Sequence, residues 1–276
     1  VAFDAAGPRP EKYPRFAADN RAGKWTGAGS IRFADPGDAS MLDFGLGDSI
    51  TLEAWVAPSK LGNGQNMYVV GKGRTKNEGF AAENQNYAMR LAGDNGRACV
   101  SFLFRNDQNR PGKQEDFHRW TTTEGFKVDG GWHHVAVTYT FGKSDSIRGY
   151  IDGKPLAGKW DYGGATNAGP VVDNDEVWIG SALGGSAGNT FEGLLDEIAI
   201  HRSALAPEKI AARYVVNLPP SYVTKPPETD DLIFCEIMEN IPDQFSWDFP
   251  IPAPTLGYIE TSFGLIGIPQ KYNSHG

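Results

Sequence analysis

Hydrophobic and polar residues alternate most regularly in residues 132–139, WHHVAVTY, where every second residue falls on the same side of an extended chain. An alternation with period two, rich in β-branched and aromatic residues, predicts a β-strand with two different faces. A second strand is predicted at residues 147–151, and the dipeptide Asp152-Gly153 that follows it is typical of a tight turn. We therefore predict an antiparallel meander over residues 130–156.

The same period identifies further strands. In residues 50–56 it places Ile50, Leu52, Ala54 and Val56 on one face. A purely apolar face of this kind should point into the interior of a β-sandwich. Other strands are predicted at residues 30–33, 68–70, 87–91, 97–104, 176–179 and 191–201, and a short helix at residues 207–214.

Other parts of the chain lack this period. Residues 1–28 contain Pro8, Pro10 and Pro14, which predict an extended arm without a strand or a helix. Three long polar stretches are predicted to be loops, each long enough to be either functional or mobile: residues 73–86, 106–119 and 159–175.

Three blocks of sequence carry a resemblance to a known family. They are GWHHVAVTY with the hairpin YIDGKPL, then SITLEAWVAP, and finally FEGLLDEIAIHRSAL with PEKIAARY. In this order and spacing, over roughly residues 29–214, they resemble the laminin-G-like, concanavalin-A-like jelly-roll domains of bacterial secreted proteins. The resemblance implies an all-β fold, a two-sheet antiparallel jelly-roll sandwich with one short C-terminal helix. It also implies a secreted, periplasmic or cell-surface location.

The composition changes near residue 219. Nine of the 18 prolines lie from Pro219 onward, and the pairs Pro219-Pro220 and Pro226-Pro227 are typical of an extended linker. We predict a β-sandwich domain at residues 1–218 and a Pro-rich linker and docking tail at residues 219–276. The tail is too apolar for a free disordered segment, so we expect it to lie across this domain or across a partner chain. The chain begins at Val1, and we expect it to be a processed or excised piece of a larger protein or complex.

Net charge limits the class of partner. At −8 the chain is a poor candidate for nucleic acid, which requires clustered Lys and Arg. No apolar run approaches the roughly 20 residues of a membrane-spanning helix. The two cysteines, Cys99 and Cys235, exclude a disulfide-dense scaffold, and the sequence leaves open whether they pair or remain two free thiols.

Exposed aromatic residues next to amide and carboxylate groups are the usual means of holding a sugar ring. Trp160 and Tyr162 stand in a predicted loop and are the first candidates for stacking. Further candidates are Trp120 and Phe80, with Asn84 and Asn86 as polar partners. The alternative is that these aromatic side chains pack back onto the edges of the sandwich.

Calcium is the metal that the resemblance implies, because many laminin-G-like domains hold one Ca²⁺ at the rim of the sandwich through carboxylate and carbonyl oxygens. Asp196, in the LDEI block, is the first candidate ligand, and Asp38, Asp43 and Asp173 are further ones. The alternative role for Asp196 is structural, as a carboxylate that accepts backbone N–H bonds and pins a loop.

Catalysis is not expected. A retaining glycosidase needs two carboxylates about 5 Å apart, whereas Asp196 and Glu197 are neighbours on a strand and point to opposite faces. The leading prediction is a non-catalytic binding module of a secreted protein that recognises a glycan or a protein surface through its loops. The alternatives are a structural or assembly module within a large exported protein, with the tail docked on a partner, and a glycoside hydrolase or lyase.

Overall fold

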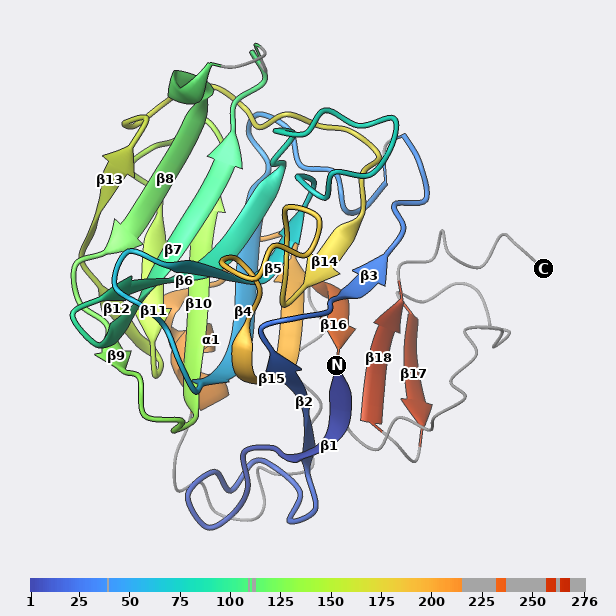
Figure 1. Ribbon diagram of the computed structural model, residues 1–276, viewed down its shortest axis with the longest axis vertical. Coiled ribbons are helices and arrows are strands. Elements are labelled where there is room, and N and C mark those ends of the chain that lie inside the picture. Colours follow the sequence, from blue (N-terminus) through green and yellow to red (C-terminus); the bar gives the residue numbers. More distant parts are fainter. Residues whose placement is uncertain are drawn as a thin grey trace.

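The computed structural model describes residues 1–38, 40–108, 110 and 113–214, together with the backbone of three short strands beyond residue 231. It is a sandwich of two antiparallel sheets, shown in Figure 1. We name the two sheets sheet A and sheet B. The fold class implied by the resemblance is thereby confirmed.

Sheet A runs in the order β12-β11-β10-β4-β15, and β2 and β16 both pair with β15. Its strands are β1 (Ala2–Ala6), β2 (Arg21–Thr26), β4 (Ser49–Pro58), β10 (His133–Thr140), β11 (Arg148–Ile151), β12 (Lys154–Leu156), β15 (Glu192–His201), β16 (Leu232–Glu236), β17 (Gly257–Thr261) and β18 (Gly264–Ile268). The predicted meander is confirmed, since β10 pairs with β11 and β11 with β12.

Sheet B runs in the order β13-β8-β7-β6-β5-β14-β3 and faces the viewer in Figure 1. Its strands are β3 (Ile31–Phe33), β5 (Asn66–Lys72), β6 (Tyr87–Asp94), β7 (Arg97–Arg105), β8 (Phe117–Thr122), β9 (Phe126–Lys127), β13 (Gly158–Tyr162) and β14 (Val177–Ile179). The helical elements within the described residues are a 3-10 turn at Gln114–Asp116 and α1 (Pro207–Tyr214).

The core lies between the inner faces of the two sheets. The apolar face of β4, formed by Ile50, Leu52, Ala54 and Val56, is fully buried in it, as predicted. Partners from sheet B alternate in the same way, for example Met67 with Val69 on β5 and Val100 with Phe102 on β7. Burial of these apolar side chains is the main stabilising term, at about 25 cal/mol per Å² removed from water.

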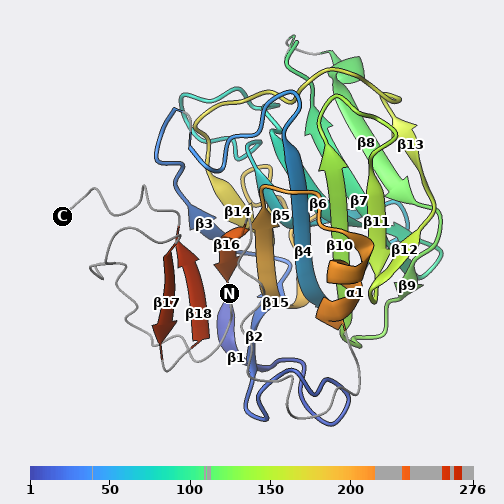
Figure 2. The same ribbon diagram turned by 180° about the vertical axis from the view of Figure 1, so that it is seen from behind.

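The outer face of sheet A is covered. Tyr13 and Phe16 pack edge-on against Trp55, with ring centroids 5.0 and 5.2 Å away. Ile210 of α1 packs with Ala136 and Tyr150, and Figure 2 shows the helix lying over this side of the sheet. Sheet B carries no helix on its outer face in the part of the chain that the structure describes.

Two predictions about irregular regions are wrong. Residues 1–28 are not only an extended arm, because β1 and β2 form a hairpin-like pair within them and the prolines fall in the segment between the strands. The predicted loop at residues 159–175 begins with a strand, β13, which pairs with β8. In both cases the strand is short and a neighbouring Pro- or Gly-rich segment obscures its period.

The C-terminal segment contributes strands to sheet A. β16 pairs with β15, and β18 pairs with both β16 and β17. The rest of the predicted linker and tail lies outside the described residues, and the domain boundary at residue 218 stays a prediction. Cys99 is a free, buried thiol. Among the described residues no helix has both the length and the apolar character needed to cross a membrane.

Candidate functional site

The strand order of sheet B brings three loops together at one end. Val177 pairs with both Phe33 and Lys72, so β3 and β5 end where β14 begins. The segments 34–43, 73–86 and 171–176 therefore converge on one edge, which we call the rim. These loops lie at the top right of Figure 1.

Lys72 is the centre of the rim. Its side chain is fully buried, and its ammonium group contacts Asp35 Oδ2 at 2.6 Å, Asp43 Oδ1, and the backbone oxygen of Asp173 at 2.6 Å. A buried ammonium group is tolerated only when it is paired and hydrogen-bonded. Lys72 therefore holds two carboxylates and one carbonyl from two separate loops in fixed positions.

Asparagine side chains fix the loop that precedes β14. Asn84 Nδ2 donates to Asp173 Oδ2 at 2.6 Å and to Asp175 Oδ2 at 3.1 Å. Asn86 Nδ2 donates to Asp173 Oδ1 at 3.2 Å. Asn84 and Asn86 are buried, so they position the Asp173 carboxylate rather than reach into solvent.

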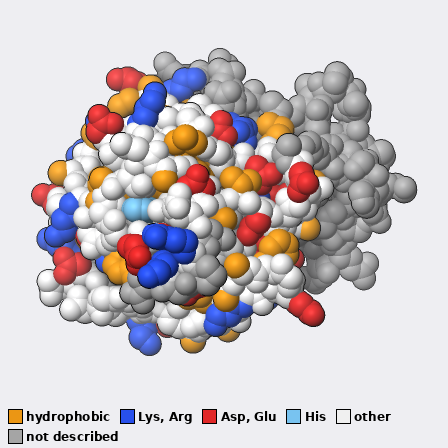
Figure 3. All heavy atoms as spheres, turned by 90° about the horizontal axis from the view of Figure 1, so that it is seen from above, with side chains coloured by type: hydrophobic (Ala, Val, Ile, Leu, Met, Phe, Trp, Pro, Cys, Tyr) orange, Lys and Arg blue, Asp and Glu red, His pale blue; other side chains and the backbone are white. Residues whose placement is uncertain are grey.

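An open cavity of about 580 Å³ lies at the rim. Its lining includes the polar residues Asp38, Asp43, Asp173 and Asn174 and the apolar residues Phe80 and Val172. Asn174 Nδ2 donates to Asp38 Oδ1 at 2.8 Å, and Val172 is 48% exposed. Figure 3 looks down on this end of the molecule, where acidic and hydrophobic side chains lie side by side in the right half of the view. The cavity thus offers hydrogen-bond acceptors beside an aromatic ring.

The rim gathers six of the predicted site residues: Phe80, Asn84, Asn86, Asp38, Asp43 and Asp173. The Asp- and Asn-rich turns that motivated these predictions are adjacent strand connections of sheet B. Lys72 and Asn174 complete the set. Nothing in the local sequence marks Lys72, because it occupies the last position of an otherwise apolar strand.

Asp196 lies elsewhere. It sits on β15 of sheet A, fully buried, where its Oδ2 accepts from Asn20 Nδ2 at 2.8 Å and its Oδ1 from the backbone N–H of Glu197 at 2.9 Å. Gly7 packs so closely here that a Cβ would come within 2.5 Å of Asn20 Nδ2. Asp196 therefore pins the segment between β1 and β2 to sheet A, which is the structural role weighed for it above.

The predicted calcium ligands do not fit a single metal site. Asp196 is on the other sheet, and Asp43 is engaged by the Lys72 ammonium group. Within the described part of the chain no cluster of three or more His, Cys, Asp or Glu residues has a geometry that could hold a metal ion. The cationic charge that organises the rim is supplied by Lys72.

The predicted stacking aromatics divide into two groups. Trp120 is buried in the core, and a Cβ added at Gly158 would come within 2.1 Å of its ring, so it is not available for stacking. Trp160 lies on β13 rather than in a loop, packs with Phe104 and Tyr139, and donates from Nε1 to the Ser144 carbonyl at 3.1 Å.

Tyr162, 37% exposed at the end of β13, is the remaining surface aromatic from that stretch. The Arg119 guanidinium lies 5.6 Å from its ring centroid. Tyr162 therefore belongs to the outer face of sheet B and not to the rim.

Two facing antiparallel sheets with a crossover strand order, and three loops that converge at one end, define a lectin-like β-sandwich. The chain belongs to the concanavalin A-like lectin/glucanases superfamily, whose family model matches residues 27–211. No curated protein matches it by sequence.

Several solved structures are similar to this chain at low sequence identity. A putative carbohydrate binding protein from Bacteroides ovatus is 15% identical, with a TM-score of 0.49, over 90% of this chain and 57% of that one. A SAP-like pentraxin from Limulus polyphemus is 12% identical, with a TM-score of 0.44, over 67% and 82%. Domains LG4-5 of the mouse laminin alpha1 chain are 13% identical, with a TM-score of 0.42, over 66% and 42%.

The chain thus spans little more than half of the Bacteroides protein and less than half of the laminin fragment. At these identities and TM-scores the matches say nothing about its ligand. The function of this chain therefore has to be argued from its own site.

Proposed function

We propose that this chain is a non-catalytic binding module that holds a neutral glycan at the rim. The observation that carries the proposal is the cavity in which Asp38, Asp43, Asp173 and Asn174 surround Phe80. Sugar hydroxyl groups donate hydrogen bonds to carboxylate and amide oxygens, and the apolar face of a sugar ring packs on an aromatic ring. The exposed groups of the cavity offer both kinds of contact.

The acceptors are held in place before a ligand arrives. Lys72 fixes Asp43, while Asn84 and Asn86 fix both oxygens of Asp173. Pre-organised side chains lose little conformational entropy on binding, and that loss is a major cost of association. The carboxylates also give the cavity a negative charge, which disfavours acidic sugars and phosphates.

A panel of neutral polysaccharides and oligosaccharides tests the rim directly. We expect Phe80→Ala to weaken binding of a neutral ligand about five- to tenfold, equivalent to roughly 1 kcal/mol of stacking. Leu46→Ala is the matched control, because Leu46 is 67% exposed and lies outside the cavity lining. Absence of binding to every neutral glycan, or an equal loss in both variants, would contradict the proposal.

Hydrolysis requires a carboxylic acid that donates a proton and a second carboxylate facing it. At the rim, Asp43 accepts a hydrogen bond from the Lys72 ammonium group and Asp173 accepts from two amide groups, so both carboxylates are already engaged as acceptors within the fold. These contacts support a binding role rather than a catalytic one. Incubation with β-glucan, alginate and arabinan should release no reducing ends or unsaturated products, and turnover of any of them would overturn this part of the proposal.

A further inference from the structure

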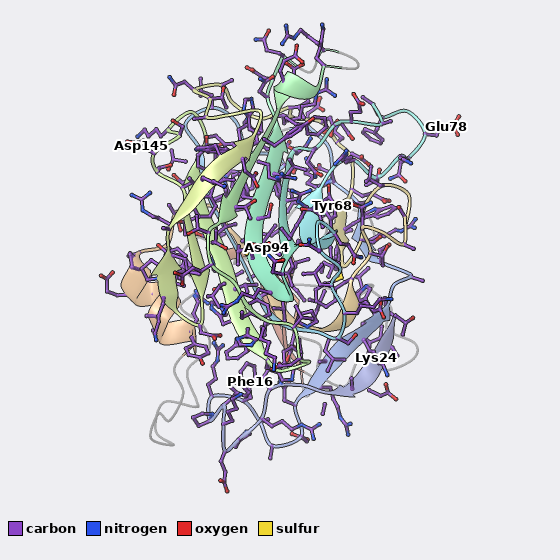
Figure 4. The ribbon with its side chains drawn as sticks, turned by 60° about the vertical axis from the view of Figure 1, so that its left-hand side comes forward. Phe16, Lys24, Tyr68, Glu78, Asp94 and Asp145 are labelled. Atoms are coloured by element: carbon purple, nitrogen blue, oxygen red, sulfur yellow. The ribbon has the colours of Figure 1, made fainter. Side chains whose placement is uncertain are left out.

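Lys72, the last residue of β5, lies on the inner face of sheet B. Its cross-strand neighbours are Tyr87 and Val177, which both belong to the hydrophobic core. Residues directly opposite each other on neighbouring strands share one face of the sheet, so the lysine side chain points into the core and not into solvent. In Figure 4, Tyr68 marks the same strand, and Glu78 marks the loop that follows it. The ammonium group is therefore enclosed at the rim end of the core.

Two carboxyl groups meet the ammonium group in this enclosed place. Lys72 Nζ contacts Asp35 Oδ2 at 2.6 Å and also contacts Asp43 Oδ1. The side chains of Lys72 and Asp35 are 0% exposed, and that of Asp43 is 10% exposed. An amine and a carboxyl group that touch each other out of water are the two reactants of an amide bond.

The two carboxyl groups are held in different ways. Asp35 Oδ1 accepts from the backbone N–H of Gly37 at 2.8 Å. Its Oδ2 accepts from Ser40 Oγ at 2.9 Å in addition to the ammonium group. Asp43 Oδ2 accepts from the backbone N–H of Ser40 at 3.0 Å, whereas its Oδ1 contacts Lys72. Among the described residues Asp43 Oδ1 has no partner besides the lysine, so it is the oxygen that can leave, and the Ser40 N–H can stabilise negative charge that develops on Oδ2.

We propose that Lys72 and Asp43 join in an intramolecular isopeptide bond. The ammonium group and the carboxylate together lose one water molecule: Nζ bonds to Asp43 Cγ, and the bond between Cγ and Oδ1 breaks. Two of the three ammonium protons leave with Oδ1 as water, and the third stays on the amide nitrogen. Asp35 carries protons from Nζ to Oδ1 and is unchanged at the end. The reaction needs no oxidant, cofactor or second substrate.

The fold supplies what such a condensation lacks in free solution. Two reactants held in contact need no encounter, and the effective molarity of well-oriented groups reaches about 10⁵–10⁸ M. The core residues around Lys72 exclude the water that would hydrolyse the product. The bond also replaces two buried opposite charges, which are costly to keep away from water, with a neutral amide.

The cross-link would fasten the loop at residues 34–43 to β5. It removes one positive and one negative charge, so the net charge of the rim stays the same. Asp43 Oδ2 becomes an amide oxygen and can still accept from Ser40. The proposal therefore does not rest on glycan binding at the rim, and the measurements that test it involve no ligand.

The mass of the purified, denatured full chain tests the bond. We expect the wild-type protein to be lighter than its sequence by one water molecule, and Lys72→Arg and Asp43→Ala to have the full mass of their own sequences. Lys127→Arg is the matched control, because the Lys127 side chain is 81% exposed and its Nζ lies 4.0 Å from Asp129 Oδ2. This variant should keep the missing water.

Tryptic digestion of the wild type locates the bond and does not depend on whether any variant folds. Trypsin cannot cut after an acylated lysine, so residues 33–60 and 61–74 should appear as one branched peptide that links Asp43 to Lys72. Two Asp-Gly pairs, at residues 129–130 and 152–153, can also lose water by forming a succinimide. The peptide map distinguishes that reaction from the cross-link.

Asp35→Asn tests the proton transfer. It should slow cross-linking at least about tenfold, measured as the linked fraction with time after synthesis, in a variant that circular dichroism shows to be folded. An unchanged rate would exclude Asp35 from the reaction. Three outcomes would overturn the bond itself: a wild-type mass equal to that of the sequence, a missing water that persists in Lys72→Arg, or a missing water that maps to an Asp-Gly pair.

Discussion

Buried charged residues lie on the outer faces of both sheets, and two of them, Glu53 and Arg90, differ in their partners. Glu53 on sheet A is 3% exposed and has three partners: His134 Nε2 at 3.3 Å, His201 Nε2 at 2.8 Å and Arg213 Nη1 at 3.0 Å. Arg90 on sheet B is 5% exposed, donates to the Ser101 hydroxyl and lies 5.5 Å from the ring centroid of Tyr68, but forms no ion pair with the described residues.

The difference follows from what covers each face. On sheet A the α1 helix and the segment between β1 and β2 cover the outer face, and Arg213 on α1 forms an ion pair with Glu53 beneath this cover. The charge of Glu53 is satisfied within the molecule and belongs to the fold. On the sheet B side Ala182 and Leu183 pack with Tyr68, and none of the described carboxylates forms an ion pair with the buried Arg90.

The largest effect should come from Glu53→Ala. Removing the carboxylate leaves Arg213 without its buried partner, and breaking a buried ion pair from one side costs about 3–5 kcal/mol. The free energy of unfolding in urea measures this loss. Glu115→Ala is the control, because the Glu115 side chain is 59% exposed and should matter by less than about 0.5 kcal/mol. A loss no larger than that of the control would mean that Glu53 does not hold the cover in place.

The packing of the cover should matter somewhat less. Ile210→Ala removes the buried contact of α1 with Ala136 and Tyr150 and should cost about 2–4 kcal/mol. Leu183→Ala, at a partly buried position on the sheet B side, should cost clearly less. Equal losses in urea unfolding would show that the two faces are covered to the same degree.

A smaller effect should appear as a dependence of stability on pH. Burial alone would raise the pKa of Glu53, but hydrogen bonds with His134 and His201 and the charge of Arg213 hold it well below its ordinary value. A carboxyl group whose pKa is depressed by folding stabilises the folded state at any pH above its pKa in the unfolded chain, which is about 4.3. This stabilisation is lost as the pH falls toward the pKa of the group in the folded protein.

The stability difference between the wild type and Glu53→Gln should therefore shrink as the pH is lowered from 6 to 3. Urea unfolding at several pH values measures it. A difference that grows on acidification would contradict the direction of the shift.

The smallest effect on stability is expected for Arg90→Met. Because the buried guanidinium has no counter-ion, replacing it with an apolar side chain of similar length should change the free energy of unfolding by less than about 1 kcal/mol in either direction. A destabilisation as large as that of Glu53→Ala would show that Arg90 is also a structural charge, and the contrast between the two faces would fail.

The fold was predictable where one face of a strand is purely apolar. Ile50, Leu52, Ala54 and Val56 all enter the core, because a period of two is decisive when one side of a strand is buried. Trp160 was misjudged as a loop aromatic, and Trp120 as a surface aromatic, because their strands are short and border Thr- and Gly-rich segments.

The candidate sites were less predictable, because they depend on which loops meet. Asp/Asn-rich turns indicated the rim, but only the register of β3, β5 and β14 brings Asp38, Asp43 and Asp173 together and leaves Asp196 behind.

The pairing of β15 has a consequence for how the chain can be shortened. Two strands pair with the same edge of β15, one after the other. Residues 192–195 pair with β2 and residues 198–201 pair with β16, and the bulge at Asp196 lies between the two pairings. In a recombinant protein that stops after α1, β2 would still pair with the first half of that edge. The second half would lose its hydrogen-bond partners, because β16 would be missing. The bare amides and carbonyls would then form a ready template for a second molecule, so self-association of the shortened protein would report missing backbone pairing rather than a natural dimer.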